Sequence, residues 1–204
     1  MSRALIVVDV QRDFCEGGAL AAADTLSLLQ SLCTFIAAAR QTGVKIVFTR
    51  DWHPPNHSSF QTTGGPWPVH CVAGSPGAEL MTPLAIDEGD LMVHKGETIV
   101  GPGYSGFDNT PLAEKLSTLN ADDVAICGVA TEYCVRATSI DALQAGLRVT
   151  LLTDLIRPVQ ADAVTDVLQE MAALGIATMA SKAWLDSSES SVDYKRPETR
   201  QDAS

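Results

Sequence analysis

The residues of this chain that could carry out chemistry stand at or just after the ends of short apolar runs. Asp9 lies at the end of the first run, Lys95 follows the third, and Cys134 lies a few residues beyond the fourth. A cysteine thiol can attack an electrophilic carbon, a carboxylate can accept the thiol proton, and a nearby lysine keeps both groups in their charged forms. Each residue alone has an ordinary structural interpretation, such as a helix cap, a solvated strand end or a core thiol. The prediction of a catalytic set therefore rests on their shared position.

Cys134 is the best candidate for a nucleophile. We expect Thr131 to cap the following helix, which places Cys134 in the first turn, where unpaired N–H groups and the helix dipole lower the pKa of a thiol. We expect Lys95 to lower that pKa further. The remaining cysteines have weaker claims. Cys33 and Cys127 are predicted to be core residues. Cys15 and Cys71 are predicted to lie in loops, where their reactivity is undecided.

A second group of residues has the composition of a metal site. Three of the four histidines of the chain lie within eighteen residues, close after an aspartate. Imidazole and carboxylate groups are ligands for divalent ions such as Zn²⁺, Mn²⁺ or Fe²⁺, of which Zn²⁺ is the first expectation. We predict Asp51, His53 and His70 as ligands. His57 is left open as a fourth ligand, because its side chain could instead anchor the loop.

Alternating strands and helices would bring these residues together. Short apolar runs predict strands at Ala4–Val10, Val44–Thr49, Leu91–His94, Val124–Cys127 and Arg148–Leu152, with a weaker sixth at Ile176–Met179. Helical patterns between them predict helices around Leu29–Ala39, from Thr110 to Leu119, and over Tyr133–Ala145 and Asp162–Leu174. This order favours right-handed βαβ crossovers and a three-layer αβα fold with a six-stranded, mostly parallel sheet. Ligands bind at the carboxyl ends of the strands in such sheets.

Composition limits the class of protein. The 204 residues, of which 46% are hydrophobic, predict one domain over 1–185, followed by a disordered tail over 186–204. A net charge of −11 without a basic block argues against nucleic acid and anionic membranes as partners. No apolar run is long enough to span a membrane. Five cysteines without a CxxC pair favour reduced thiols and a cytoplasmic protein. Whether it forms a homo-oligomer is left open.

Five stretches of the chain together resemble one branch of the isochorismatase-like cysteine hydrolases, the nicotinamidases and pyrazinamidases. The stretches are Asp9–Phe14 (DVQRDF), Asp51–Pro54 (DWHP), Trp67–Cys71 (WPVHC), Lys95-Gly96 and Gly128–Val135 (GVATEYCV). The first and last are features of the superfamily, whereas the DWHP and WPVHC pair, which brings the metal, indicates this branch. The resemblance implies a Rossmann-like hydrolase fold. It also implies hydrolysis of nicotinamide to nicotinate and ammonia in NAD salvage, with pyrazinamide as a further substrate.

The resemblance also assigns roles to residues. It makes Asp9, Lys95 and Cys134 a catalytic triad that works through a thioester. It implies a cis peptide bond between Val129 and Ala130, and an oxyanion hole formed by the backbone amides of Ala130 and Cys134. Three aromatic residues match positions whose rings enclose the pyridine in this family: Phe14, Trp67 and Tyr104. The implied role of the metal is to hold the ring nitrogen and orient the carboxamide rather than to activate water.

Three other functions stay open at this point. Another isochorismatase-like cysteine hydrolase, acting on a carbamoyl or other small amide substrate, would need no metal, so the histidines count against it. A metal-dependent hydrolase that attacks through a metal-bound hydroxide would leave Cys134 a structural residue. A non-catalytic small-molecule binding module would have no need for a complete set of Asp9, Lys95 and Cys134.

Overall fold

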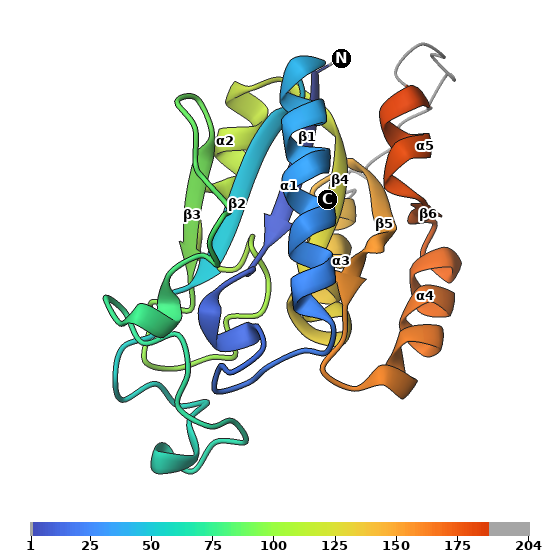
Figure 1. Cartoon of the computed structure of the whole chain (residues 1–204). Helices are drawn as coiled ribbons and strands as arrows, with labels where there is room; N and C mark the ends of the chain where they lie inside the picture. Colours follow the sequence, from blue (N-terminus) through green and yellow to red (C-terminus); the bar gives the residue numbers. More distant parts are fainter. Residues whose placement is uncertain (1, 188–204) are drawn as a thin grey trace, which may run out of the picture.

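The centre of the molecule is a parallel β-sheet. The computed structural model describes residues 2–187 of the chain. Within them six strands lie in the order β3-β2-β1-β4-β5-β6. The strands are β1 (Ser2–Val8), β2 (Lys45–Asp51), β3 (Leu91–Lys95), β4 (Ala121–Val129), β5 (Arg148–Arg157) and β6 (Ala177–Met179). All neighbouring pairs are parallel, so the carboxyl ends of the strands share one edge of the sheet (Figure 1).

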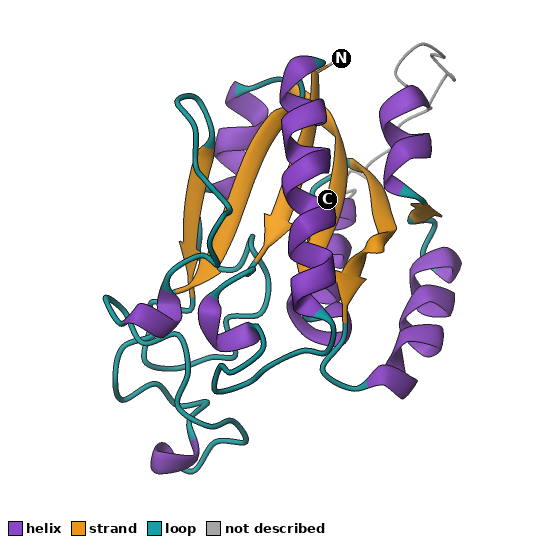
Figure 2. Cartoon of the chain, in the orientation of Figure 1, coloured by secondary structure: helices purple, strands orange, loops and turns teal. Residues whose placement is uncertain are grey.

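Helices cover both faces of this sheet. One face carries α1 (Thr25–Gln41) and α5 (Ser181–Asp186), and the other carries α2 (Leu112–Thr118), α3 (Arg136–Gln144) and α4 (Val164–Ala173). Two hydrophobic clusters fill the spaces between the layers, one beneath each set of helices. The purple helices on either side of the orange sheet make these three layers visible (Figure 2). The predicted αβα fold with six strands is confirmed.

The central strand and the first helix show why the sequence folds this way. Residues 4–8 of β1 are all fully buried, as expected for a strand covered on both faces. The apolar stripe of α1 lies against the sheet, with Leu32 and Ala39 fully buried. Gly43 follows α1 with a φ of 80°, in the left-handed region that a helix-ending glycine adopts without strain.

Several predicted boundaries were wrong for identifiable reasons. The predicted first strand reached Val10, but β1 ends at Val8, because Asp9 adopts a left-handed φ of 51° and turns the chain out of the sheet. The predicted third helix began at Tyr133, whereas the structure has a π-helical turn before α3. Helix α5 was not predicted. Its first turn is capped by a distant residue, since Asp154 accepts hydrogen bonds from the backbone N–H and the hydroxyl of Ser181, both 2.7 Å.

Loops gather at the carboxyl edge of the sheet. The longest joins β2 to β3 and contains only two short 3₁₀ turns, η2 (Gln61–Thr63) and η3 (Pro76–Ala78). It runs through the teal region below the strands in Figure 2, where the turn η1 (Arg12–Phe14) is drawn as a short purple helix. The tail predicted over 186–204 lies outside the described residues except for its first two. None of the helices within residues 2–187 has the length and apolar character that crossing a membrane requires.

Candidate active site

Four neighbouring strands deliver the predicted residues to this edge. Asp9 follows β1, Asp51 and Lys95 are the last residues of β2 and β3, and Cys134 lies in the turn after β4. Asp51 and Lys95 are register partners across the sheet. The order β3-β2-β1-β4 makes these four strand ends consecutive. The sequence prediction that these residues meet is therefore confirmed.

The ammonium group of Lys95 is the centre of the cluster. Its Nζ lies 2.8 Å from Asp9 Oδ2, 2.5 Å from Asp51 Oδ1 and 3.3 Å from Cys134 Sγ. It also donates a hydrogen bond of 3.0 Å to the carbonyl of Gly103. The Lys95 side chain is completely buried. A buried cation needs this many partners, because it has lost its hydration. Lys95 therefore connects the nucleophile, the acid and one metal-ligand candidate.

Burial dominates the protonation of the catalytic pair. The pKa of Asp9 is raised by burial and by the charge of Asp51, although Lys95 opposes the shift. Burial also raises the pKa of the Cys134 thiol well above its usual range, and the charge of Lys95 does not compensate for burial and the two carboxylates. Burial thus opposes the thiolate that the sequence analysis predicted. A thiol with a raised pKa lies beside a carboxylate whose pKa is also raised.

The turn that carries Cys134 differs from the predicted helix start. Residues Thr131–Val135 form a π-helical turn. The Thr131 hydroxyl is buried and has no hydrogen-bond partner within residues 2–187, so Thr131 is not the predicted cap. The peptide bond between Val129 and Ala130 is cis, as the resemblance implied. Gly128 before it has a φ of 115°, and a Cβ there would stand 2.1 Å from a backbone oxygen of β1. Only glycine allows this approach, which brings the turn close to Asp9.

The metal-ligand candidates also come together. Asp51, His53 and His70 are buried, and each offers a ligand atom within 4.8 Å of the others. Nδ1 of His53 lies 2.9 Å from the carbonyl of Gly96, and Nδ1 of His70 lies 2.8 Å from that of Pro68. A carbonyl only accepts, so each Nδ1 carries the proton and each Nε2 keeps a free lone pair. This arrangement is typical of histidines that bind a metal through Nε2.

His57 is close to this group but does not belong to the three. Its ring stacks on that of His53, with centroids 4.1 Å apart, and its Nδ1 lies 2.7 Å from the hydroxyl of Ser59. The ring is buried, and its Nε2 has no hydrogen-bond partner among the described residues. The backbone N–H of Ser59 also donates to this Nδ1 at 3.3 Å, so Nδ1 accepts and the neutral ring carries its proton on Nε2. The fourth ligand, left open by the sequence, stays open.

An aromatic pocket adjoins both groups. Ala130 and Cys134 form part of its walls. The three rings predicted from the resemblance also line it: Phe14, Trp67 and Tyr104. Trp67 donates a hydrogen bond of 3.0 Å from its indole N–H to the Tyr104 hydroxyl. Sequence reasoning missed Tyr133 and Val159, which also line the pocket. Tyr133 could have been predicted, because it is next to Cys134 in the sequence. Val159 lies in the loop after β5, and no local sequence pattern marks it as a pocket residue.

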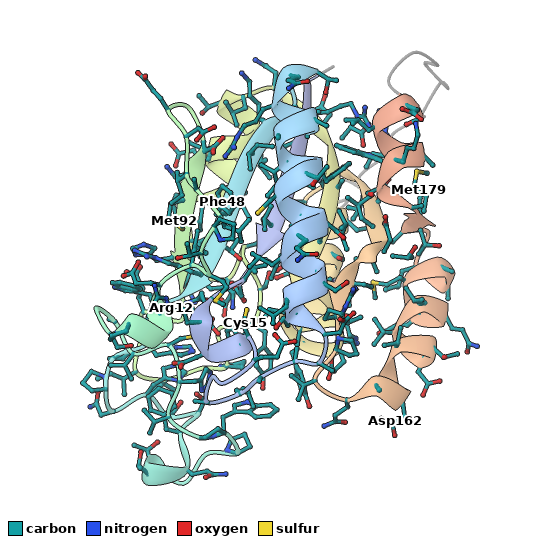
Figure 3. All side chains as sticks on the ribbon, in the orientation of Figure 1. Arg12, Cys15, Phe48, Met92, Asp162 and Met179 are labelled. Atoms are coloured by element: carbon teal, nitrogen blue, oxygen red, sulfur yellow. The ribbon has the colours of Figure 1, made fainter. Side chains whose placement is uncertain are left out.

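The pKa of the thiol does not separate the other four cysteines from Cys134. Burial raises the pKa of each of their thiols, and that of Cys71 well above the usual range, as it does for Cys134. Cys127 is fully buried, as predicted, whereas Cys33 is only partly buried on α1. Cys15, at the end of the turn that also carries Arg12 (Figure 3), is buried too. Position distinguishes Cys134, because its Sγ lies 3.3 Å from Lys95 Nζ and it lines the aromatic pocket.

Comparison with known proteins places this geometry in a family. The isochorismatase domain model matches residues 3–183. The chain belongs to the isochorismatase family. One relative within it is the nicotinamidase/pyrazinamidase of Mycobacterium tuberculosis, which is 39% identical over 175 residues. That alignment covers 83% of this chain and 94% of the relative.

Solved structures of the isochorismatase family share this fold. The pyrazinamidase of Pyrococcus horikoshii in complex with zinc superimposes with a TM-score of 0.85 at 43% identity, covering 88% of this chain and 99% of that one. A protein from L. infantum in complex with nicotinate gives a TM-score of 0.82 at 37% identity, covering 89% and 94%. The suspected branch of the family is therefore confirmed by sequence and by structure.

Proposed function

We propose that this isochorismatase-family protein is a nicotinamidase, which hydrolyses nicotinamide to nicotinate and ammonia and also accepts pyrazinamide. The observation that carries the proposal is Lys95, which joins a Cys–Asp pair to a three-donor metal group beside an aromatic pocket. The names of the relatives support the same amide substrates. The reaction would belong to NAD salvage in the cytoplasm, with a small molecule as the binding partner.

In the first half of the reaction the Cys134 sulfur attacks the carboxamide carbon while Asp9 takes the thiol proton. The raised pKa of Asp9 suits it to this task, since a base of higher pKa binds the proton more firmly. Backbone amides of Ala130 and Cys134 stabilise the oxyanion. Protonated Asp9 then returns the proton to the leaving nitrogen as the C–N bond breaks, which releases ammonia and leaves a thioester on Cys134.

In the second half a water molecule replaces ammonia. Asp9 again acts as the base and accepts a proton from water as its oxygen attacks the thioester carbon. The carbon–sulfur bond breaks and Asp9 returns its proton to sulfur. The product is nicotinic acid, which releases the other water proton to solvent and leaves as nicotinate. Lys95 holds Asp9 in place through both halves. Its positive charge also stabilises the sulfur as negative charge develops there.

The residues present fit a divalent metal ion. Asp51, His53 and His70 supply one carboxylate and two imidazoles, and the second nitrogens of both histidines face carbonyls. This donor set suits Zn²⁺, with Mn²⁺ and Fe²⁺ as alternatives. A bound ion would supply a Lewis acid for the ring nitrogen and so orient the carboxamide toward Cys134. Phe14, Trp67 and Tyr104 would enclose the ring.

Ammonia release from nicotinamide by the purified protein tests the proposal. The zinc-loaded wild type should release ammonia, and a chelator should remove most of the activity. Cys134→Ala should lose activity by several orders of magnitude while keeping its metal, because it removes the sulfur that forms the thioester. Cys127→Ala, which changes a thiol outside the pocket, is the matched control and should keep the activity.

Two outcomes would contradict this assignment. An active Cys134→Ala protein would indicate attack by a metal-bound hydroxide and a structural role for Cys134. Activity on carbamoyl compounds but not on nicotinamide would indicate the other branch of the family. Mass spectrometry of the wild type with substrate should find the acyl group on Cys134 and not on Cys71 or Cys15.

A further inference from the structure

The metal-ligand candidate Asp51 stands at a gap in the sheet. The register of β1 with β2 ends at the pair Val8 and Thr49, because Asp9 turns the chain away from β2. Asp51, two residues further along β2, still has β3 on one side, where Lys95 is its partner. On its other side, β1 has already ended, so its backbone offers no hydrogen-bond partner to Asp51. Without a replacement, the N–H and C=O of Asp51 would be buried without partners.

The side chain of Gln11 fills this gap. Its Oε1 accepts a hydrogen bond of 2.8 Å from the N–H of Asp51, and its Nε2 donates one of 2.8 Å to the carbonyl of the same residue. The second Nε2 hydrogen is donated to the carbonyl of Ala78 at 2.9 Å. Gln11 is completely buried. Its carboxamide thus takes the place of a strand peptide and fixes the backbone from which the Asp51 carboxylate projects.

Asp13 holds the backbone next to His70, another of the metal-ligand candidates. Its Oδ2 accepts a hydrogen bond of 2.7 Å from the N–H of Cys71, the residue directly after His70. Cys71 has a left-handed φ of 46°, which a non-glycine residue adopts only when its surroundings hold it there. Gly77 packs so closely that a Cβ would meet the Asp13 carboxylate at 2.2 Å. The carboxylate therefore packs between Gly77 and the Cys71 backbone that follows His70.

We propose that Gln11 and Asp13 are positioning residues of the metal site. Gln11 sets the backbone of Asp51, Asp13 sets the backbone beside His70, and neither contacts the substrate. The inference rests on the metal in the proposed function. The turn that begins at Asp9 would then serve both parts of the site, since Asp9 acts on the thiol while Gln11 and Asp13 hold the metal ligands. Loss of such outer partners weakens metal binding by about 10- to 100-fold.

Zinc affinity of the metal-free protein, measured by competition with a chromogenic chelator, tests this inference. Asp13→Ala should weaken zinc binding by about 10- to 100-fold. Asp13→Asn is the matched variant, because it keeps an oxygen for the Cys71 N–H but loses the charge, and it should bind zinc nearly as well as the wild type. Gln11→Glu should bind weakly, since it keeps the acceptor but loses both donated hydrogen bonds. Arg12→Ala changes the exposed side chain between them and should have no effect.

Thermal unfolding of the metal-free variants separates positioning from general stability. A purely structural role would lower the unfolding temperature of Asp13→Ala and leave its zinc affinity unchanged, which would overturn the inference. If Asp13→Ala and Asp13→Asn bind zinc equally weakly, the charge of Asp13 matters and its hydrogen bond to Cys71 does not. If both bind zinc as the wild type does, Asp13 has no part in zinc binding. Either result would overturn the inference. If Gln11→Glu does not fold, the comparison of Asp13→Ala with Asp13→Asn still tests the inference. A wild type that binds no zinc would refute the proposed metal itself, which is a separate outcome.

Discussion

Asp51 is the residue at which the two parts of the site meet. Its Oδ1 faces Lys95 at 2.5 Å, and its Oδ2 lies 3.5 Å from Nε2 of His53. Burial would raise the pKa of Asp51, but Lys95 and His53 lower it well below its usual range. The carboxylate is therefore ionised under all ordinary conditions. One oxygen neutralises the buried lysine while the other is directed toward the metal group.

The contact between Asp51 and His53 should make zinc binding depend on pH. Burial would lower the pKa of His53, but the hydrogen bond and charge of Asp51, with the Gly96 carbonyl, raise it above the ordinary value of about 6.5. A metal needs the neutral imidazole, so below this pKa a proton competes for Nε2. Zinc affinity should therefore begin to fall at a higher pH than for an ordinary histidine, by about tenfold per pH unit. Chelator competition from about pH 8 to pH 5.5 measures the midpoint.

His57 supplies the control for this midpoint. Burial and the charge of His53 lower its pKa to about 4, more than Asp51 and the Gly101 backbone raise it. His57 therefore titrates below the measured range. His57→Ala should leave the midpoint unchanged, whatever it does to the absolute affinity. An affinity that does not change with pH across this range would mean that His53 does not bind the metal.

At the scale of elements, the turn that carries Cys134 is braced from outside. The carboxylate of Glu132 accepts hydrogen bonds from the N–H groups of Val159, at 3.0 Å, and Gln160, at 2.7 Å. This contact ties the π-helical turn after β4 to the loop after β5. Val159 lines the aromatic pocket. Glu132 therefore holds one wall of the pocket against the turn of the nucleophile.

Removing this brace should affect substrate binding more than chemistry. Glu132→Ala leaves two N–H groups without a charged acceptor, and such hydrogen bonds each contribute about 1.5–3 kcal/mol. With nicotinamide as substrate, kcat/KM should fall about tenfold or more, mainly through a higher KM, since Glu132 does not touch the reacting atoms. Glu132→Gln keeps one oxygen and should remain close to the wild type. A fall in kcat alone, or equal effects of both variants, would contradict the bracing role.

Local patterns predicted the elements but not the contacts between distant residues. The apolar runs placed the strands, and the rule that parallel strands share a carboxyl edge brought Asp9, Lys95 and Cys134 together. The early end of β1, by contrast, depends on the left-handed turn at Asp9, which no periodicity indicates. Likewise Gln11 reads as an ordinary polar residue until its hydrogen bonds to Asp51, forty positions away, are seen. The domain limit at residue 185 stays a prediction.

At the scale of the whole molecule, the proposed metal would fasten the least regular part of the chain to the sheet. Asp51 ends β2, whereas His53 and His70 belong to the long loop that connects β2 to β3. A divalent ion would thus join a strand to two loop residues that are seventeen positions apart in the sequence. A ligand that binds only the folded state stabilises it by mass action. Metal loading should therefore be visible in the stability of the entire domain.

Thermal unfolding with and without zinc measures this effect. At a free zinc concentration of about 1,000 times Kd, the gain in free energy of unfolding is about 4 kcal/mol. For a domain of this size, 1 kcal/mol shifts the unfolding temperature by roughly 2–4 °C, so the expected rise is on the order of 10 °C. His70→Ala should lose most of that rise, because it leaves the loop without its far ligand. Arg12→Ala should keep the whole rise. An unfolding temperature that zinc does not change would show that the three donors hold no metal, and would leave Asp51 only the task of neutralising Lys95.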